Sequence, residues 1–192
     1  MLFGSSGIRR EFGSGLVDLA LRIGAVTAAG ASTITVGRDT RTTSELLEHA
    51  VVSGMLSAGA TVYSCGIAPT PTVAHATRNT DAGCMITASH NPESYNGVKL
   101  LNPDGSSFTL RQQAAIEEAL RATHWRTWDE QGHVSPIDAV DAHREAILDK
   151  VSLSRPVTAV LDCGNGAGSV ITPDLLAAAG ATVIGLNCNV MG

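Results

Sequence analysis

The sequence of this 192-residue chain predicts an α/β fold: a three-layer αβα domain built on a mixed, mostly parallel sheet, followed by the start of a second, similar α/β domain. Two observations support this prediction. Helical and strand patterns alternate along the chain, which is typical of parallel strands joined by helices. Polar, glycine-containing stretches follow several of the expected strands, at the positions where open α/β sheets bind their ligands.

The first unit is expected to hold four helices and three strands. Its clearest helical period lies between residues 44 and 58, where apolar side chains recur three or four positions apart. Gly30 and Gly59 end the first two helices, because glycine readily adopts the conformation that stops a helix. Pro71 lies near the first turn of the third helix, where a missing N–H is tolerated. The expected helices are 16–29, 44–58, 70–78 and 110–122, and the expected strands are 33–36, 60–65 and 82–87.

A second unit is expected after residues 125–135, which are polar and irregular. Residues 136–151 have a helical pattern, and a strand, a helix and a strand follow. The expected strands are 157–161 and 182–186, and the helix between them ends at Ala179.

The phrase AGATV occurs at residues 58–62 and again at 179–183, each time where a helix stop leads into a strand. We interpret it as a sign that the second unit repeats the topology of the first, although any two such crossovers could share so short a match. One strand–helix–strand turn is too small a sheet to bury both of its faces. We therefore expect two domains, residues 1–135 and an incomplete 136–192, in an N-terminal fragment of a longer protein.

Composition excludes several classes of partner. The formal charge of −5 provides no basic surface for nucleic acid, and the apolar stretches are too short and too interrupted to span a membrane. The four cysteines include no C-x-x-C pair, and three of them lie in or beside expected strands. They are interpreted as reduced core thiols of a cytoplasmic protein, with a metal or redox role as the alternative.

Four stretches at or near strand ends suit a cluster of anionic oxygens: FGSSGIRR, VGRDTR, TASHNP and DCGNGAGS. The cations that these stretches and the following segment contribute are Arg9, Arg38, Arg41 and Lys99. Guanidinium forks and glycine-exposed backbone amides together favour phosphate. The alternative is that Arg38, Asp39 and Arg41 form a local salt-bridge turn.

Ser89 is the candidate nucleophile. Alanine precedes it and histidine follows it, so the G-x-S-x-G elbow of the α/β-hydrolases is absent. Adjacent side chains seldom face each other, so His90 does not make a convincing Ser–His dyad. A serine among cations is better suited to carrying a phosphoryl group than an acyl group. The alternative is an ordinary strand-to-loop corner that Ser89 caps and Asn91-Pro92 ends.

These residues match the motifs of a family. TASHNP followed by YNGVK resembles the phosphoserine loop of the α-D-phosphohexomutases, which include phosphoglucomutase, phosphomannomutase and phosphoglucosamine mutase. FGSSGIR is similar to their F-G-T-x-G-I-R-G segment, VGRDTRTTS to their G-x-D-x-R stretch, GIAPTPTVAHA to their G-x-x-x-T-P turn, and DCGNGAGS to the opening of their second domain. The matches occur in the family's order along the whole chain.

The resemblance implies a role for each of these positions. Ser89 would carry a phosphoryl group, donate it to a hexose phosphate and recover another from the hexose 1,6-bisphosphate that results; this bisphosphate also serves as the activator. One oxygen of phosphorylated Ser89 would bind Mg²⁺. Arg9 and Lys99 would stabilise the phosphate charge and, with His90, assist proton transfer. Asn91 would shape the loop and contact the phosphate, and Arg38 and Arg41 are further candidate phosphate-binding residues.

The chain departs from the family pattern in three ways. Arg10 stands where the motif usually has glycine, which puts the placement of Arg9 in question. The aspartate-rich D-G-D-x-D-R metal loop does not occur. The sugar-recognition loop and the C-terminal phosphate loop are also missing. The resemblance therefore implies a chain that does not turn over by itself, because one phosphate oxygen and water are too few ligands for Mg²⁺.

Alternatives to this function follow from the same sequence. The chain could be a non-catalytic binding or interaction domain that keeps the fold, or a hydrolase whose Ser89 reacts with acyl inhibitors, although no spacing favours the latter. DCGNGAGS lacks the last glycine of a dinucleotide fingerprint and is interpreted as a helix N-terminus between domains. Thr87 slightly favours a glucose or mannose phosphate over glucosamine phosphate. Trp125 and Trp128 are expected to pack the junction of the units, and His143 is expected at the surface.

Overall fold

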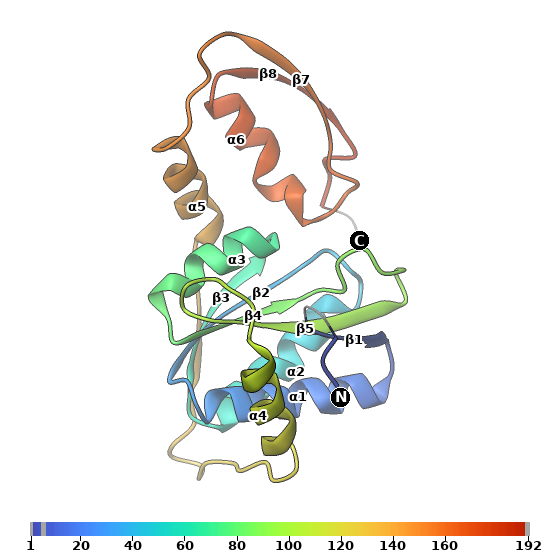
Figure 1. Ribbon diagram of the computed structural model, residues 1–192, viewed down its shortest axis with the longest axis vertical. Helices are drawn as coiled ribbons and strands as arrows, with labels where there is room; N and C mark the ends of the chain where they lie inside the picture. Colours follow the sequence, from blue (N-terminus) through green and yellow to red (C-terminus); the bar gives the residue numbers. More distant parts are fainter. Residues whose placement is uncertain (1, 5–6, 191–192) are drawn as a thin grey trace.

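The computed structural model describes residues 2–4 and 7–190 (Figure 1). Ser5 and Ser6 of the FGSSGIRR stretch lie outside the described residues, as do Met1, Met191 and Gly192.

Six strands form one mixed sheet in the order β1-β5-β4-β2-β3-β6. The central pairs β4–β2 and β2–β3 are parallel, as is the β3–β6 pair at one edge, whereas β5 is antiparallel to both β4 and β1. The strands are β1 (Ile8–Glu11), β2 (Thr33–Arg38), β3 (Thr61–Ile67), β4 (Ala82–Ile86), β5 (Tyr95–Leu101) and β6 (His133–Pro136). The mixed, mostly parallel sheet that the sequence predicts is confirmed.

Helices cover both faces of this sheet, which gives the three predicted layers (Figure 1). On one face, α1 (Ser14–Ala28), α2 (Ser44–Ser57) and α4 (Leu110–Ala119) enclose the larger apolar core, which includes the fully buried Ile34 and Leu47. On the other face, α3 (Thr70–Ala76) and α5 (Ala139–Leu148) lie over a smaller core around Met85 and Leu101. The α3 helix runs into a short 3₁₀ helix, η1 (Thr77–Asn79).

Strand β6 corrects the expectation of an irregular segment at residues 125–135 followed by a helix from residue 136. Residues 133–136 instead pair in parallel with β3, with His133 opposite Thr61 and Pro136 opposite Ser64. Proline is tolerated there because β6 is an edge strand. The α5 helix begins only at Ala139, behind Asp138, whose carboxylate accepts the Asp141 N–H at 3.0 Å. Strands β1 and β5 are likewise additions to the three strands expected from local pattern.

The second unit contains the expected strand–helix–strand turn. Strands β7 (Val157–Asp162) and β8 (Ala181–Leu186) are parallel, and η2 (Ala167–Val170) and α6 (Thr172–Ala178) join them. Both copies of the AGATV phrase have the same local structure: Gly59 (φ 90°) follows α2 and Gly180 (φ 100°) follows α6, each in the left-handed region that glycine tolerates.

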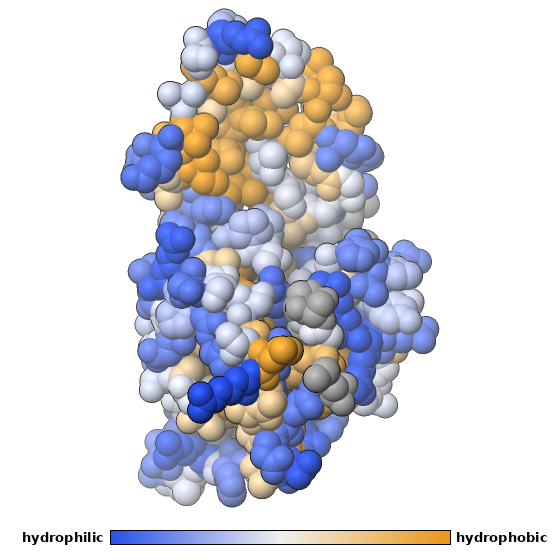
Figure 2. All heavy atoms as spheres, in the orientation of Figure 1, coloured by the Kyte–Doolittle hydropathy of each residue, from blue (hydrophilic) through white to orange (hydrophobic). Residues whose placement is uncertain are grey.

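One face of the β7–β8 pair is exposed among the described residues. Val160 and Ile184 lie opposite each other in register and are 67% and 51% exposed. Figure 2 shows apolar side chains gathered at this end of the molecule. The expectation that two strands cannot bury both faces of a sheet is confirmed by these exposures.

Two expectations about single side chains are wrong. Trp125 and Trp128 are 51% and 89% exposed, in the segment between α4 and β6, and do not pack a junction. His143 is half-buried: its ring stacks on His75 of α3, with ring centroids 4.9 Å apart, and its Nδ1 lies 2.9 Å from Thr72 Oγ1. No described helix combines the length and the apolar character needed to span a bilayer.

Candidate functional site

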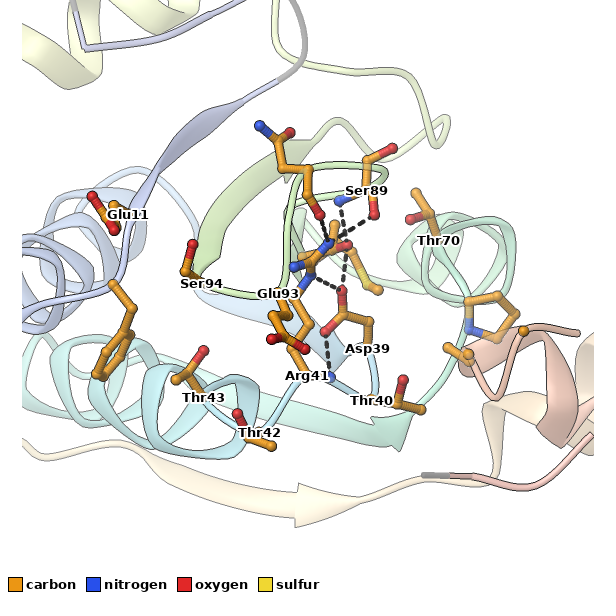
Figure 3. Close-up of a pocket in the computed structure, with 18 residues that line it drawn as sticks. Glu11, Asp39, Thr40, Arg41, Thr42, Thr43, Thr70, Ser89, Glu93 and Ser94 are labelled. Atoms are coloured by element: carbon orange, nitrogen blue, oxygen red, sulfur yellow. Dashed lines mark hydrogen bonds and ion pairs between the residues drawn. The ribbon is translucent and has the colours of Figure 1, made fainter. Parts of the chain in front are cut away.

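A cavity of about 950 Å³ lies at the carboxyl ends of the central strands, beside the loop that follows β4 (Figure 3). The loops after β2, β3 and β4 supply most of its wall, and the second unit adds Gly164, Gly166 and Ala167. Thus DCGNGAGS, interpreted from sequence as a helix N-terminus between domains, also borders the site. The remaining lining residues include Glu11, Asp39, Arg41, Thr87, Ser89, Asn91, Glu93 and Ser94.

Ser89 lies at the exposed tip of this loop in a backbone conformation unusual for serine. Its φ of 56° is in the left-handed region, where residues other than glycine are rare and functional sites are common. Its backbone N–H donates to Thr87 Oγ1 at 2.9 Å, and its Oγ lies 3.4 Å from His90 Nδ1. The 3.4 Å separation is long for an O···N hydrogen bond, so His90 is beside the hydroxyl without holding it firmly.

Asp39 links this loop to the central sheet. Its backbone N–H continues the β2–β4 pairing by donating to the Ile86 carbonyl at 3.0 Å. Its Oδ2 accepts the Thr87 hydroxyl at 2.6 Å, and its Oδ1 accepts the Ser44 hydroxyl at 2.5 Å. A carboxylate that accepts several hydrogen bonds is held firmly in position, so Asp39 gives the Ser89 loop a fixed attachment to the central sheet.

The Arg41 guanidinium lies inside the loop (Figure 3). Its Nε donates to Asp39 Oδ2 at 3.3 Å, and its two amino groups donate to four backbone carbonyls. The carbonyls, with donor–acceptor distances of 2.9, 2.8, 2.7 and 3.0 Å, belong to Ser89, Asn91, Pro92 and Tyr95.

Arg38 has a different environment from the other predicted phosphate ligands. Its Nε donates to Glu48 Oε2 of α2 at 2.8 Å, and Glu48 Oε1 accepts the Ser64 hydroxyl at 2.8 Å. The Arg38 and Glu48 side chains are only 18% and 9% exposed. The structure thus places Arg38 in an ion pair between β2 and α2. Of the local salt-bridge turn that was the alternative, the structure has the Asp39–Arg41 pair, whereas Arg38 pairs outside the turn, with Glu48.

Arg9 and Lys99 come from neighbouring antiparallel strands and share one face of the sheet. Arg9 of β1 is opposite Gly97 of β5, and Lys99 is opposite Met85 of β4, a residue that lines the cavity. Residues 97 and 99 face the same way because side chains alternate along a strand. Arg9 also reaches the Ser89 loop directly, since its Nη1 donates to Asn91 Oδ1 at 3.4 Å. The described residues that line the cavity do not include Arg9, His90 or Lys99.

Asn96 supports the loop and is not among the site residues predicted from sequence. Asn96 is fully buried, and its Nδ2 donates to both Thr43 Oγ1 and Ser44 Oγ at 2.9 Å. Asn96 lies in the YNGVK motif, and a polar side chain in an apolar run is the signal that could have identified it. Thr87 uses its hydroxyl within the loop, a group that serine would equally supply. The identity of Thr87 therefore says little about the sugar.

The described side chains do not by themselves form a Mg²⁺ site. The described residues contain no group of three or more His, Cys, Asp and Glu side chains placed to hold a metal ion. The Asp39 carboxylate beside the loop is already committed to Thr87, Ser44 and Arg41. Ser89, once phosphorylated, would offer a single oxygen ligand.

Comparison with known proteins gives one family. Residues 1–127 match the family model of phosphoglucomutase/phosphomannomutase, α/β/α domain I. A probable phosphoglucosamine mutase of Methanococcoides burtonii is 46% identical over 190 residues, which cover 97% of this chain and 44% of that protein. A phosphoglucosamine mutase of Methanococcus aeolicus is 38% identical over 201 residues, covering 100% of this chain and 43% of that protein.

Solved structures agree with this assignment. A phosphoglucomutase/phosphomannomutase family protein from Burkholderia thailandensis superposes with a TM-score of 0.88 at 27% identity, over 98% of this chain and 44% of that one. A putative phosphomannomutase from Thermus thermophilus gives 0.78 at 25% identity, over 97% and 46%. This chain spans less than half the length of the curated relatives it matches. The chain belongs to the α-D-phosphohexomutase family, and its first 127 residues are the family's α/β/α domain I.

Proposed function

We propose that this chain is the phosphoserine-bearing part of a phosphohexomutase that interconverts hexose 1-phosphates and hexose 6-phosphates. The observation that carries the proposal is Ser89 itself, held in a left-handed conformation beside a cavity at the carboxyl edge of the sheet. The left-handed conformation costs free energy in a serine, and such costs are found mainly at functional sites. A serine that must present its Oγ in one fixed direction accounts for this cost better than an ordinary loop serine.

The proposed chemistry consists of two phosphoryl transfers through Ser89. In the first, the Oγ–P bond of phosphorylated Ser89 breaks as the free hydroxyl oxygen of the hexose phosphate bonds to phosphorus, and the proton of that hydroxyl passes to the serine oxygen. In the second, the hexose 1,6-bisphosphate returns its other phosphoryl group to Ser89. We assign His90 to proton transfer, and Arg9 and Lys99 to the charge of the transferring group, together with Asn91, which Arg9 contacts.

The names of the relatives point to a substrate. The two curated relatives described above are named phosphoglucosamine mutase or probable phosphoglucosamine mutase, which supports glucosamine phosphate as the first hexose phosphate to test. Mg²⁺ would neutralise phosphate charge at Ser89 when bound, with its remaining ligands supplied from outside this chain. We propose that the protein acts in the cytoplasm, which its four free cysteines support.

We also propose that the chain is divided into residues 1–135 and 136–192, and that it does not complete turnover by itself. Support for two units comes from the two separate sheets, of six strands and of β7 and β8, and within this arrangement β6, which includes Pro136, and α5, whose Val140 packs on the Met85 and Leu101 cluster, lie with the first sheet. Two observations support the proposal that the chain does not complete turnover by itself. The described residues contain no cluster of metal ligands, and the match covers 44% of the length of the Methanococcoides burtonii relative.

Intact-protein mass tests the role of Ser89. We expect the chain, incubated with glucose 1,6-bisphosphate or glucosamine 1,6-bisphosphate and Mg²⁺, to gain one phosphoryl group. Ser89→Ala should gain none, whereas Ser94→Ala, which removes another hydroxyl from the same cavity wall, should gain one. No hexose 1-phosphate should be converted to hexose 6-phosphate by any of these chains.

Two other results would contradict the proposal. A chain that takes up no phosphoryl group but still binds hexose phosphate would fit the non-catalytic binding domain. A Ser89 that reacts with acyl-type serine inhibitors would fit the hydrolytic alternative.

A further inference from the structure

The side chains around Arg41 point to a role for it that differs from phosphate binding. We propose that Arg41 and Asp39 are positioning residues: together they close a ring of hydrogen bonds around Ser89 that fixes its left-handed backbone before any phosphate is present. The proposal rests on the proposed function only in so far as Ser89 is the residue that carries the phosphoryl group.

The donors of Arg41 are fully used. A guanidinium group has five N–H donors in a rigid planar fork and no acceptor. Arg41 has five acceptors in the structure: Asp39 Oδ2 for Nε, and two backbone carbonyls for each amino group. Its side chain is only 14% exposed. A phosphate could hydrogen-bond to Arg41 only by displacing one of these acceptors, so Arg41 is poorly placed to be its ligand.

The acceptors explain why a guanidinium is needed. The carbonyl oxygens of Ser89, Asn91, Pro92 and Tyr95 converge on one point inside the loop. Oxygens that carry partial negative charge repel one another at such a point unless a cation lies between them. Lysine supplies at most three donors from a single nitrogen, which cannot reach four carbonyls and Asp39 in the planar fork arrangement. The loop therefore requires arginine by geometry as well as by charge.

The hydrogen bonds form a closed ring through Asp39. The N–H of Ser89 donates to Thr87 Oγ1, and the Thr87 hydroxyl donates to Asp39 Oδ2. The carbonyl of Ser89 accepts from Arg41 Nη2, and Arg41 Nε donates to the same Asp39 oxygen. Both polar backbone groups of Ser89 are thus tied, each through one side chain, to a single carboxylate oxygen. This arrangement sets the direction in which the Ser89 side chain leaves the loop.

The ring is anchored in the central sheet. Asp39 directly follows β2, which lies between β3 and β4. The second oxygen of Asp39 accepts the hydroxyl of Ser44, which is fully buried at the start of α2. Because the donors of Arg41 are all bonded to the loop and to Asp39, Arg9 and Lys99 are the residues that would neutralise the charge of a phosphate on Ser89. They lie on the sheet face next to the loop.

Hydrogen–deuterium exchange of the 192-residue chain, without phosphate or sugar phosphate, tests this proposal. In Arg41→Lys, which keeps the charge, we expect peptides covering residues 88–96 to exchange at least about tenfold faster, because several charge-assisted hydrogen bonds are lost. Asp39→Asn should have a similar local effect, and peptides from α1 and α4 should be unchanged. Arg121→Lys is the matched control, since the Arg121 side chain is 77% exposed and forms its ion pair with Glu118, far from the Ser89 loop in sequence.

A rescue experiment separates positioning from a merely structural role. In Arg41→Ala, ethylguanidinium at a concentration far below its denaturing range should restore slow exchange in residues 88–96, whereas ethylammonium should not. If Arg41→Ala does not fold, the comparison of Arg41→Lys with wild type remains decisive. Unchanged exchange of residues 88–96 in Arg41→Lys, or equal rescue by both cations, would overturn the proposal.

Failure of this proposal is distinguishable from failure of the proposed function. The exchange measurements contain no phosphate and report only on the loop. Phosphoryl uptake by wild-type Ser89 reports only on the function. If the positioning role of Arg41 and the phosphoryl-carrying role of Ser89 are both correct, Arg41→Lys should slow phosphoryl uptake. The bisphosphate concentration that gives half the maximal rate should not change, because a positioning residue does not contact the ligand.

Discussion

Gly97 of β5 lies directly opposite Arg9 of β1, and a Cβ atom at Gly97 would come within 2.0 Å of the Ile8 carbonyl oxygen. Only glycine allows the two strands to approach this closely. The spacing of β1 and β5 in turn sets where Arg9 stands relative to Asn91 in the Ser89 loop. The pairing of β1 with β5 is therefore part of the site as well as of the fold.

We expect Gly97→Ala to destabilise the chain by about 3 kcal/mol, because the added methyl group meets backbone that cannot move aside without breaking the β1–β5 pairing. Urea unfolding followed by circular dichroism would measure it. Gly15→Ala is the matched control: apart from its chain neighbours and the adjacent helix backbone, nothing lies within 4 Å of its added Cβ, and alanine in the α1 helix should increase stability by about 0.5–1 kcal/mol. Equal effects of the two substitutions would contradict the close approach.

The chain should be more stable with glycine at position 89 than with alanine. The left-handed conformation at φ 56° costs a residue with a Cβ atom roughly 1–2 kcal/mol, a cost that glycine does not bear. We therefore expect Ser89→Gly to unfold at a higher urea concentration than Ser89→Ala, with a difference of about 1 kcal/mol in the free energy of unfolding. If alanine is the more stable of the two, Ser89 is not left-handed in solution.

The Arg38–Glu48 ion pair should matter for stability. Arg38→Met would leave the Glu48 carboxylate buried with the Ser64 hydroxyl as its remaining donor among the described side chains, and we expect a loss of about 3 kcal/mol. Arg121→Met, which removes an exposed pair with Glu118, should change the free energy of unfolding by less than about 0.5 kcal/mol. Thermal and urea unfolding of the two variants beside wild type make the comparison. A small effect in both would show that Glu48 finds another partner or a proton.

The contact between α3 and α5 should weaken in acid. The pKa of His143 is lowered by burial, and then by the neighbouring His75 and Arg78. A base whose folded pKa lies below its unfolded value contributes stability that is present above the unfolded value, near 6.5, and is lost as the pH falls below it. The free energy of unfolding of wild type should therefore drop more steeply below pH 6.5 than that of His143→Gln.

His49→Gln is the control for this pH dependence, because His49 is exposed on α2. Its unfolding should have the same pH profile as wild type. If His143→Gln and His49→Gln have the same slope, the stacked His75–His143 pair does not couple protonation to the packing of α5 on α3.

Local sequence was sufficient to predict the regular elements on which the fold is built. Helical patterns, with Gly30, Gly59 and Pro71 as start and stop signals, identified α1, α2, α3 and α4, and runs of apolar and β-branched residues identified β2, β3 and β4, because these signals lie within short consecutive stretches of the chain. The position of Ser89 after β4 followed directly, as did the cluster of loops at the carboxyl edge. Strands β1, β5 and β6 were not predicted as strands: β1 and β6 are specified by pairing with strands far away in sequence, and β5, although it also pairs with the preceding β4, joins the sheet edge to β1.

Signals within the amino-acid sequence were enough to predict the layers, the alternation of helix and strand, the family resemblance and the choice of Ser89 as the proposed phosphoryl carrier. The contacts of the arginines could not be predicted in this way and are set by the folded chain: Arg38 pairs with Glu48, and Arg41 donates to carbonyls inside the loop. A cation in a sequence suits a phosphate, a carboxylate and a ring of carbonyls equally well. Which of these it contacts depends on the oxygen atoms that the folded chain brings within hydrogen-bond distance, and those come from residues as far apart in sequence as Arg9 and Asn91, 82 positions.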